Sequence, residues 1–254
     1  MFDFFKNRRR AALRKEPLTE EERALLDRNV PYAQKLTPEE RAELEQLVRI
    51  FLSEKSFEGC GGLELTEAMK VTIAAQACLL LLHRDTDIYP RVDSILVYPS
   101  AYRAPQQTSV SGGLVIEGTQ ERLGETSTRG AVVLAWDHVA ADAHRPGDGQ
   151  NVVLHEFAHQ LDGEEGPIDG VPDLGPRERY TSWAAVLGAE YEALTAEIHA
   201  GRSSDIDDYG ATSPAEFFAV VTEMFFEKGA ALKGRHPALY EQLAAFYRQD
   251  PAAR

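Results

Sequence analysis

The stretch NVVLHEFAHQLD, residues 151–162, decides how the rest of the chain is interpreted. It contains the pattern His-Glu-x-x-His, formed by His155, Glu156 and His159. Apolar residues fill most of its other positions, which predicts a helix that is buried nearly all round. Residues four apart lie on one face of a helix, so both imidazoles can point at one position. Buried imidazoles and carboxylates destabilise a fold when they are unpaired, and a bound metal ion removes that penalty.

The spacing of His155 and His159 indicates a zinc-binding site. Tetrahedral zinc accepts two imidazole nitrogens at about 2.0–2.1 Å each. Glu156 lies beside that axis, where it can accept a proton from metal-activated water without binding the metal itself. The alternative interpretation is a chance match, in which the two histidines are ordinary core residues with satisfied hydrogen bonds.

A catalytic zinc site needs a third protein ligand and an open fourth position. The extended pattern HExxHxxGxxH fails, because Asp162 replaces its glycine and Glu165 its last histidine. Asp162 is better placed to orient the second histidine than to bind metal. Glu216 and Glu223 lie seven residues apart in the apolar segment 213–226, which predicts another buried helix. We choose Glu216 as the ligand and Glu223 as a partner for an imidazole N–H, and the alternative for either is a solvated glutamate.

Charge and cysteine content argue against several classes of function. The chain has 254 residues, and its 27 basic and 41 acidic residues give a formal net charge of −14. Such a charge disfavours general nucleic-acid binding. Cys60 and Cys78 form no CxxC pair, which argues against a thiolate zinc site or a disulfide framework. Acyl transfer through either cysteine is also disfavoured, because neither has a histidine nearby in the sequence.

The first ten residues, MFDFFKNRRR, place aromatic residues before basic ones. A secretory signal has the opposite order, so we expect a cytoplasmic protein. We interpret these residues as a frayed, solvated tail, the alternative being a weak contact with an anionic membrane or an acidic partner. No run reaches the ~18 consecutive apolar residues of a membrane span.

The chain divides into a helical first part and a mixed second part. Thr37, Pro38 and Glu40 predict a capped helix start, and a further helix is expected over about 66–82. Short β-rich runs follow at 94–98, 113–116 and 131–136, and their close spacing predicts antiparallel pairing. Further helices are expected over about 151–162, 177–199, 214–228 and 237–249.

These elements predict an α+β fold that is mainly helical, with a small, largely antiparallel sheet packed on the helix of the His-Glu-x-x-His motif. We expect a helical N-terminal region over 1–85 and a metallopeptidase domain over 86–254, the alternative being one continuous domain. The run Gly130–Trp136 is our candidate for a cleft edge that pairs with an extended peptide.

The blocks NVVLHEFAHQLDG and YGATSPAEFFAVVTEMFF, with LTPEERAELEQLVRIFL upstream, resemble the Mlc titration factor A family of bacterial zinc metallopeptidases. The resemblance implies a zincin-like catalytic core related to the catalytic domain of anthrax lethal factor. It also implies one zinc ion on His155, His159 and a ligand from the second block, with Glu156 as general base. In that wider group a tyrosine precedes the glutamate ligand by seven residues. Tyr209 and Glu216 match this spacing, which favours Glu216 over Glu223.

The resemblance further implies aminopeptidase-like activity on small peptides and binding to Mlc, a glucose-regulatory transcriptional repressor. Our hypothesis is therefore zinc-dependent peptide hydrolysis, in which Tyr209 can donate its hydroxyl to the oxyanion. From spacing alone, a surface loop tyrosine is the alternative. The competing hypothesis is a non-enzymatic, zinc-stabilised protein that sequesters a repressor. In that case Glu223 or Asp162 would close the fourth metal position.

Overall fold

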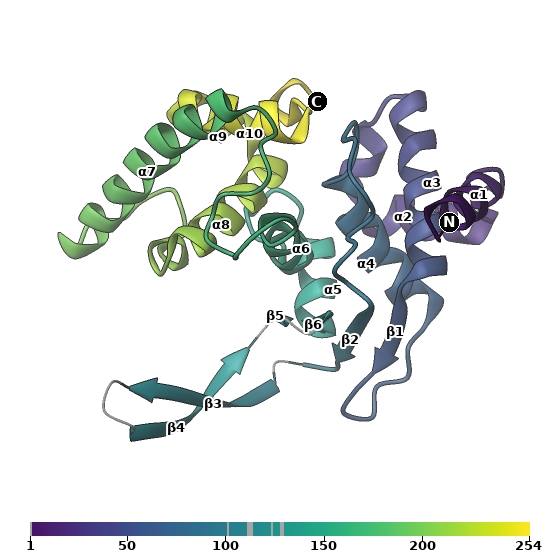
Figure 1. Cartoon of the computed structure of the whole chain (residues 1–254), viewed down its shortest axis with the longest axis horizontal. Coiled ribbons are helices and arrows are strands. Elements are labelled where there is room, and N and C mark those ends of the chain that lie inside the picture. Colours follow the sequence, from purple (N-terminus) through teal and green to yellow (C-terminus); the bar gives the residue numbers. More distant parts are fainter. Residues whose placement is uncertain (1, 101, 111–113, 123, 128–129) are drawn as a thin grey trace.

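The computed structural model describes the backbone of residues 2–100, 102–110, 114–122, 124–127 and 130–254, and the side chains of residues 5–100 and 130–254. The chain is mainly helical with a small sheet, which confirms the predicted α+β class (Figure 1). The α-helices are α1 (Phe2–Leu13), α2 (Glu20–Asn29), α3 (Pro38–Glu54), α4 (Glu67–Leu79), α5 (Trp136–His144), α6 (Val152–Asp162), α7 (Arg177–His199), α8 (Pro214–Glu227), α9 (Gly229–Arg235) and α10 (Pro237–Tyr247). Short 3-10 helices are η1 (Pro31–Lys35), η2 (Asp208–Ala211) and η3 (Pro251–Ala253).

The main sheet is mostly parallel, so the antiparallel prediction is wrong. Its strands lie in the order β1 (Ser56–Gly59), β2 (Ser94–Tyr98), β6 (Ala131–Ala135) and β5 (Gly124–Ser127). Strands β1, β2 and β6 are parallel, and β5 alone is antiparallel to its neighbour. Parallel strands need long connections. Helix α4 supplies one of them, and the chain between β2 and β6 supplies the other.

Much of that second connection forms a separate antiparallel hairpin of β3 (Tyr102–Val110) and β4 (Leu114–Arg122). Figure 1 shows this hairpin extending away from the helices. The predicted strand 113–116 contributes residues 114–116 to β4, whereas residue 113 lies outside the described residues. Because β6 pairs with strands on both sides, it is not a sheet edge, and the expectation that Gly130–Trp136 receives a peptide is wrong. The terminal strand on that side is β5.

Local signals in the first part of the chain behave as the sequence predicts at α3 but not at α1. At α3 the Thr37 side chain accepts the Glu40 N–H and the Glu40 carboxylate accepts the Thr37 N–H, which confirms the capping box. At α1 the expected solvated tail is wrong. Arg10 forms ion pairs with Glu54 of α3 and with Asp87, so the helix is held against the body of the protein.

Helix α6 lies at the centre of the molecule, between α8 and the strands (Figure 1). Asn151 begins it by accepting the Leu154 N–H on its side chain. The Phe157 ring packs edge-on against Tyr89, with centroids 4.7 Å apart, and against Phe51 of α3 at 5.7 Å. These contacts fix the rotation of α6 about its axis and turn the opposite face of the helix towards α8.

The hydrophobic core is continuous between the two regions that the sequence distinguishes. Buried apolar side chains of α3 and α4 belong to the same cluster as those of α6, α8 and α10. Strand β1, which precedes residue 85, also pairs with β2, which follows it. The division of the chain into two domains stays a prediction. Among the described residues, none of the helices combines the length and the apolar character needed to cross a membrane.

His236 links three segments on the α7 side of the molecule. Its Nδ1 lies 2.8 Å from Glu190 Oε2 on α7, and its Nε2 lies 3.2 Å from Asp205 Oδ1 in the segment before η2. Burial lowers the pKa of His236, but the hydrogen bonds to Asp205 and Glu190 outweigh it, so this pKa lies above its usual value. The contact therefore stabilises the fold when His236 is protonated, and it anchors the segment that leads to Tyr209.

We expect the stabilisation by His236 to depend on pH. A histidine whose pKa is raised by folding stabilises fully below its unfolded pKa of about 6.5, and less as pH rises through the folded pKa. The His236→Gln variant should therefore lose up to about 1 kcal/mol of unfolding free energy at about pH 6, and less at about pH 9. Urea unfolding at both pH values measures this difference. His199→Gln, a change at an exposed histidine of α7, is the control. An equal loss at both pH values would contradict the ion-pair interpretation.

Candidate metal centre

The two histidines of the motif lie one turn apart on α6, where helical spacing places them. Their ring centroids are 4.9 Å apart, and both side chains are largely buried. Because the apolar contacts of Phe157 fix the helix from its other side, both imidazoles face α8. The sequence prediction that these side chains point at one position therefore agrees with the geometry.

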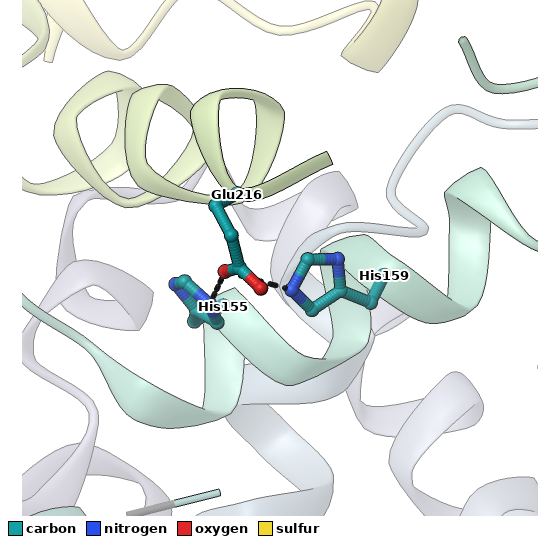
Figure 2. A group of neighbouring side chains, drawn as sticks. All are labelled: His155, His159 and Glu216. Atoms are coloured by element: carbon teal, nitrogen blue, oxygen red, sulfur yellow. Dashed lines mark hydrogen bonds and ion pairs between the residues drawn. The ribbon is translucent and has the colours of Figure 1, made fainter. Parts of the chain in front are cut away.

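Glu216 approaches the histidines from the first turn of α8. Ser213 caps this helix by accepting the Glu216 N–H at 3.2 Å, and Pro214 occupies its first position. Glu216 Oε2 then lies 3.0 Å from His155 Nε2 and 3.3 Å from His159 Nε2. Figure 2 shows the carboxylate pointing from α8 between the two rings. Two nitrogen donors and one oxygen donor therefore converge, each able to offer one ligand atom within 4.8 Å of the others.

The electrostatics of this group favour a cation. Burial raises the pKa of Glu216, but hydrogen bonds to His155 and His159 outweigh it and hold the pKa well below its usual range. Burial lowers the pKa of His155, but hydrogen bonds to Glu216 and Glu223 outweigh it and raise the pKa. In both cases the negative carboxylates favour positive charge between the two helices. A divalent cation can provide that charge with both imidazoles neutral.

Glu223 holds the far side of the His155 ring. Its Oε1 lies 2.7 Å from His155 Nδ1, and its Oε2 accepts the Asn151 N–H at 2.5 Å. Metal-binding histidines usually donate their second N–H in this way, which orients the ring and selects the tautomer. This is the geometry that the sequence analysis assigned to Glu223. Glu216 and Glu223 thus lie on one face of α8 and contact opposite edges of one imidazole.

Asp162 does not make the contact with His159 that the sequence analysis assigned to it. His159 Nδ1 and Asp162 Oδ1 are both buried without a hydrogen-bond partner. Asp162 Oδ2 instead accepts the Gly170 N–H at 2.7 Å. This bond fixes the loop that follows α6. A helix pattern places Asp162 near His159, but it cannot show that a loop amide competes for the carboxylate.

Gly170 brings that loop against the start of α8. Its φ is +85°, a conformation that favours glycine, and a Cβ there would lie 2.4 Å from the Pro214 carbonyl oxygen. Its own carbonyl accepts the Trp183 Nε1–H at 3.0 Å. The sequence analysis missed this residue, since one glycine in a glycine-rich loop carries no distinguishing signal.

Glu156 and Tyr209 occupy different surroundings. Glu156 on α6 is 5% exposed, between the two histidines in sequence. Tyr209 in η2 is 51% exposed, and its ring centroid lies 5.9 Å from that of His155. Asp207 caps η2 by accepting the Tyr209 N–H at 2.9 Å. The structure therefore brings a solvent-accessible tyrosine beside the converging donors, although its spacing in the sequence alone was ambiguous.

We expect Glu223→Gln to weaken metal binding by about 10–100-fold, because the acceptor that orients His155 is replaced by a neutral amide. Competition with a chromogenic chelator measures the affinity. Glu192→Gln, which removes an exposed carboxylate of α7, is the matched control. Unchanged affinity in Glu223→Gln would show that the contact with His155 does not support the metal site.

Comparisons with known proteins agree over nearly the whole chain. The profile of the glucose-regulated metallo-peptidase M90 family matches residues 4–248. The protein slr2042 of Synechocystis sp. is 43% identical over 244 residues, which cover 96% of this chain and 89% of the relative. Mlc titration factor A of Klebsiella pneumoniae (strain 342) is 35% identical over 230 residues, which cover 89% of this chain and 85% of the relative. The resemblance noted in the sequence is confirmed, and this chain belongs to the glucose-regulated metallo-peptidase M90 family.

Proposed function

We propose that this protein is a zinc-dependent peptidase of aminopeptidase-like specificity, with one zinc ion on His155, His159 and Glu216. The convergence of these three donors from two crossing helices carries the proposal. Membership of a metallopeptidase family supports both a bound metal and peptide hydrolysis. Two imidazoles and one carboxylate are a ligand set used by catalytic zinc in peptidases.

A fourth coordination position left open to water would favour catalysis over a purely structural metal. Structural zinc sites usually have four protein ligands, whereas catalytic sites have three. The two carboxylates that could supply a fourth ligand have other contacts, and Asp162 keeps one buried oxygen without a hydrogen-bond partner. Glu223 contacts His155 Nδ1 and the Asn151 N–H, and Asp162 contacts the Gly170 N–H. This pattern supports the enzyme over the non-enzymatic alternative.

The residues around the donors have complementary roles in this mechanism. A divalent cation at this position supplies Lewis-acid activation of water and of the scissile carbonyl. Glu156 accepts the proton of the attacking water and passes it to the leaving amine, and its burial strengthens these electrostatic interactions. Tyr209 donates its hydroxyl to the developing oxyanion, and its exposure leaves room for a substrate.

Strand β5 is the proposed edge along which an extended peptide binds. It ends the main sheet on the side of β6, and it contacts α6. Backbone pairing with a terminal strand fixes a peptide without selecting its sequence, while side-chain subsites give specificity. Small peptides of varied sequence are therefore suitable first substrates.

A protein partner is a separate part of the proposal. Relatives at 31–35% identity are named Mlc titration factor A. By similarity to them, we propose that this chain also binds a transcriptional repressor of the Mlc type. Binding and hydrolysis can be tested independently, because pull-down of a repressor by a turnover-deficient variant requires no catalysis.

We expect purified protein to contain one zinc ion per chain, and Glu156→Gln to retain that zinc while turnover falls by about 10²–10⁴-fold. Metal analysis combined with hydrolysis of chromogenic amino-acid and peptide substrates tests both points. Glu165→Gln is the matched control, because Glu165 is exposed and lies outside the donor group. Full turnover in Glu156→Gln would exclude Glu156 as the base, and absence of zinc affinity would exclude the proposed cofactor.

Tyr209→Phe should lower kcat by about 10²–10³-fold with little change in KM or zinc content, since the hydroxyl acts on charge that develops in the transition state. Steady-state kinetics on the same substrates measures this split. Tyr180→Phe removes a hydroxyl that hydrogen bonds to Asp173, and it serves as the control. A change confined to KM would instead indicate that Tyr209 only binds substrate.

A further inference from the structure

A cavity of about 230 Å³ lies beside Asn151, whose backbone N–H is donated to Glu223. Residues of α2, η1, α4, α5, α6 and α8 line it, together with the loop before α6. None of the three metal donors is among them. The cavity is therefore separate from the candidate metal centre and has room for a small organic molecule.

Two carboxylates line this cavity. The hydrogen-bond donors to these carboxylates are backbone and side-chain amide N–H groups. Asp142 accepts the Val152 N–H at 2.9 Å, and Glu227 accepts the Gly147 N–H at 2.6 Å and Asn151 Nδ2–H at 3.4 Å. Burial raises the pKa of Asp142 to about 6, and burial also raises the pKa of Glu227. The surroundings therefore penalise negative charge, and a cationic ligand would relieve that penalty.

Gln76 is a further polar residue of the cavity lining. Gln76 on α4 is 2% exposed, and its Oε1 is buried without a hydrogen bond. A buried acceptor without a donor is costly, and such groups in native proteins call for a water, an ion or a ligand. This observation is independent of the two carboxylates, and it likewise favours a ligand that donates hydrogen bonds.

Aromatic rings complete the lining. Tyr32 and Phe226 pack edge to face, with centroids 5.6 Å apart, and both contribute to the cavity wall. Carboxylates beside aromatic faces are suited to organic cations, because a ring attracts positive charge while it excludes water. Inorganic divalent ions prefer more oxygen ligands than these walls provide. Lys35, the cationic residue of the lining, is exposed.

We propose that this cavity is a binding site for a small organic ammonium ion, held by Asp142, Glu227 and Gln76 against the rings of Tyr32 and Phe226. The ammonium group donates to the three acceptors, and its alkyl chain contacts the apolar wall. The site is additional to the peptidase function, because no residue of the catalytic mechanism lines it.

The same residues connect the cavity to the metal centre. Asp142 holds the first turn of α6 through the Val152 N–H. Asn151, which lines the cavity, donates its N–H to Glu223, and Glu223 contacts His155 Nδ1. Occupancy of the cavity is therefore coupled to the orientation of a metal ligand, and coupling between two binding sites is reciprocal.

Calorimetric titration of the zinc-loaded protein with butylammonium chloride tests the site, with butan-1-ol as the uncharged analogue and sodium chloride as the ionic-strength control. We expect saturable binding of butylammonium alone. Glu227→Gln and Gln76→Met should each weaken it about tenfold, because each removes an acceptor from the ammonium group. Glu192→Gln, remote from the cavity, should leave it unchanged.

Gln76→Met also separates this site from a water-filled cavity. It should keep or raise the Tm of the ligand-free protein, since it removes an unpaired buried acceptor, whereas a lowered Tm would show that water already satisfies that acceptor. Equal heats for butylammonium and butan-1-ol, or equal affinity in wild type and both variants, would overturn the proposal. Saturable binding of calcium chloride in place of butylammonium would also overturn it. Equal butylammonium Kd values for zinc-loaded and zinc-free protein would overturn the coupling to the metal centre.

Discussion

The contact between two carboxylates of α8 and the imidazoles of α6 is the constraint on which the structure depends. Both helices are apolar over most of their surface, so they pack in the interior together with any charged residue they carry. Charges in such a place must be paired. Glu216 and Glu223 meet this requirement at opposite edges of His155. The axial position and rotation of both helices are therefore fixed by polar contacts as well as by packing.

Residues outside the two helices hold this contact in place. Asn151 caps α6 with its side chain and contacts Glu223 through its backbone, so one residue fixes both the start of the helix and the carboxylate behind it. Ser213 caps α8 by accepting the N–H of Glu216 itself. His155 and Glu216 thus each lie about one helical turn from a cap, where backbone positions are well defined.

Local rules predicted helices such as α4, α6 and α8 and the histidine pair on α6, because these depend on spacing within a helix. The pair His155 and His159 and the cap at Thr37 follow from such spacing alone. The choice of Glu216 over Glu223 did not, and it needed the resemblance to a known family. Strand direction was predicted wrongly, because most of the chain between β2 and β6 forms its own hairpin, and of that stretch the strand β5 alone joins the main sheet among the described residues. The partners of Arg10 were also unpredictable, since Glu54 and Asp87 are distant in sequence.

Gly170 is not one of the three candidate metal donors, yet its backbone fits between Asp162 and the carbonyl of Pro214. Any larger residue there would push against the segment that carries Glu216 two positions later. The positions of this loop therefore differ in how freely their residue type can vary among related proteins. Exposed neighbours such as Val171 can be substituted without disturbing the helix. Position 170 cannot, because the start of α8, more than forty residues further along the chain, leaves no room for a side chain there.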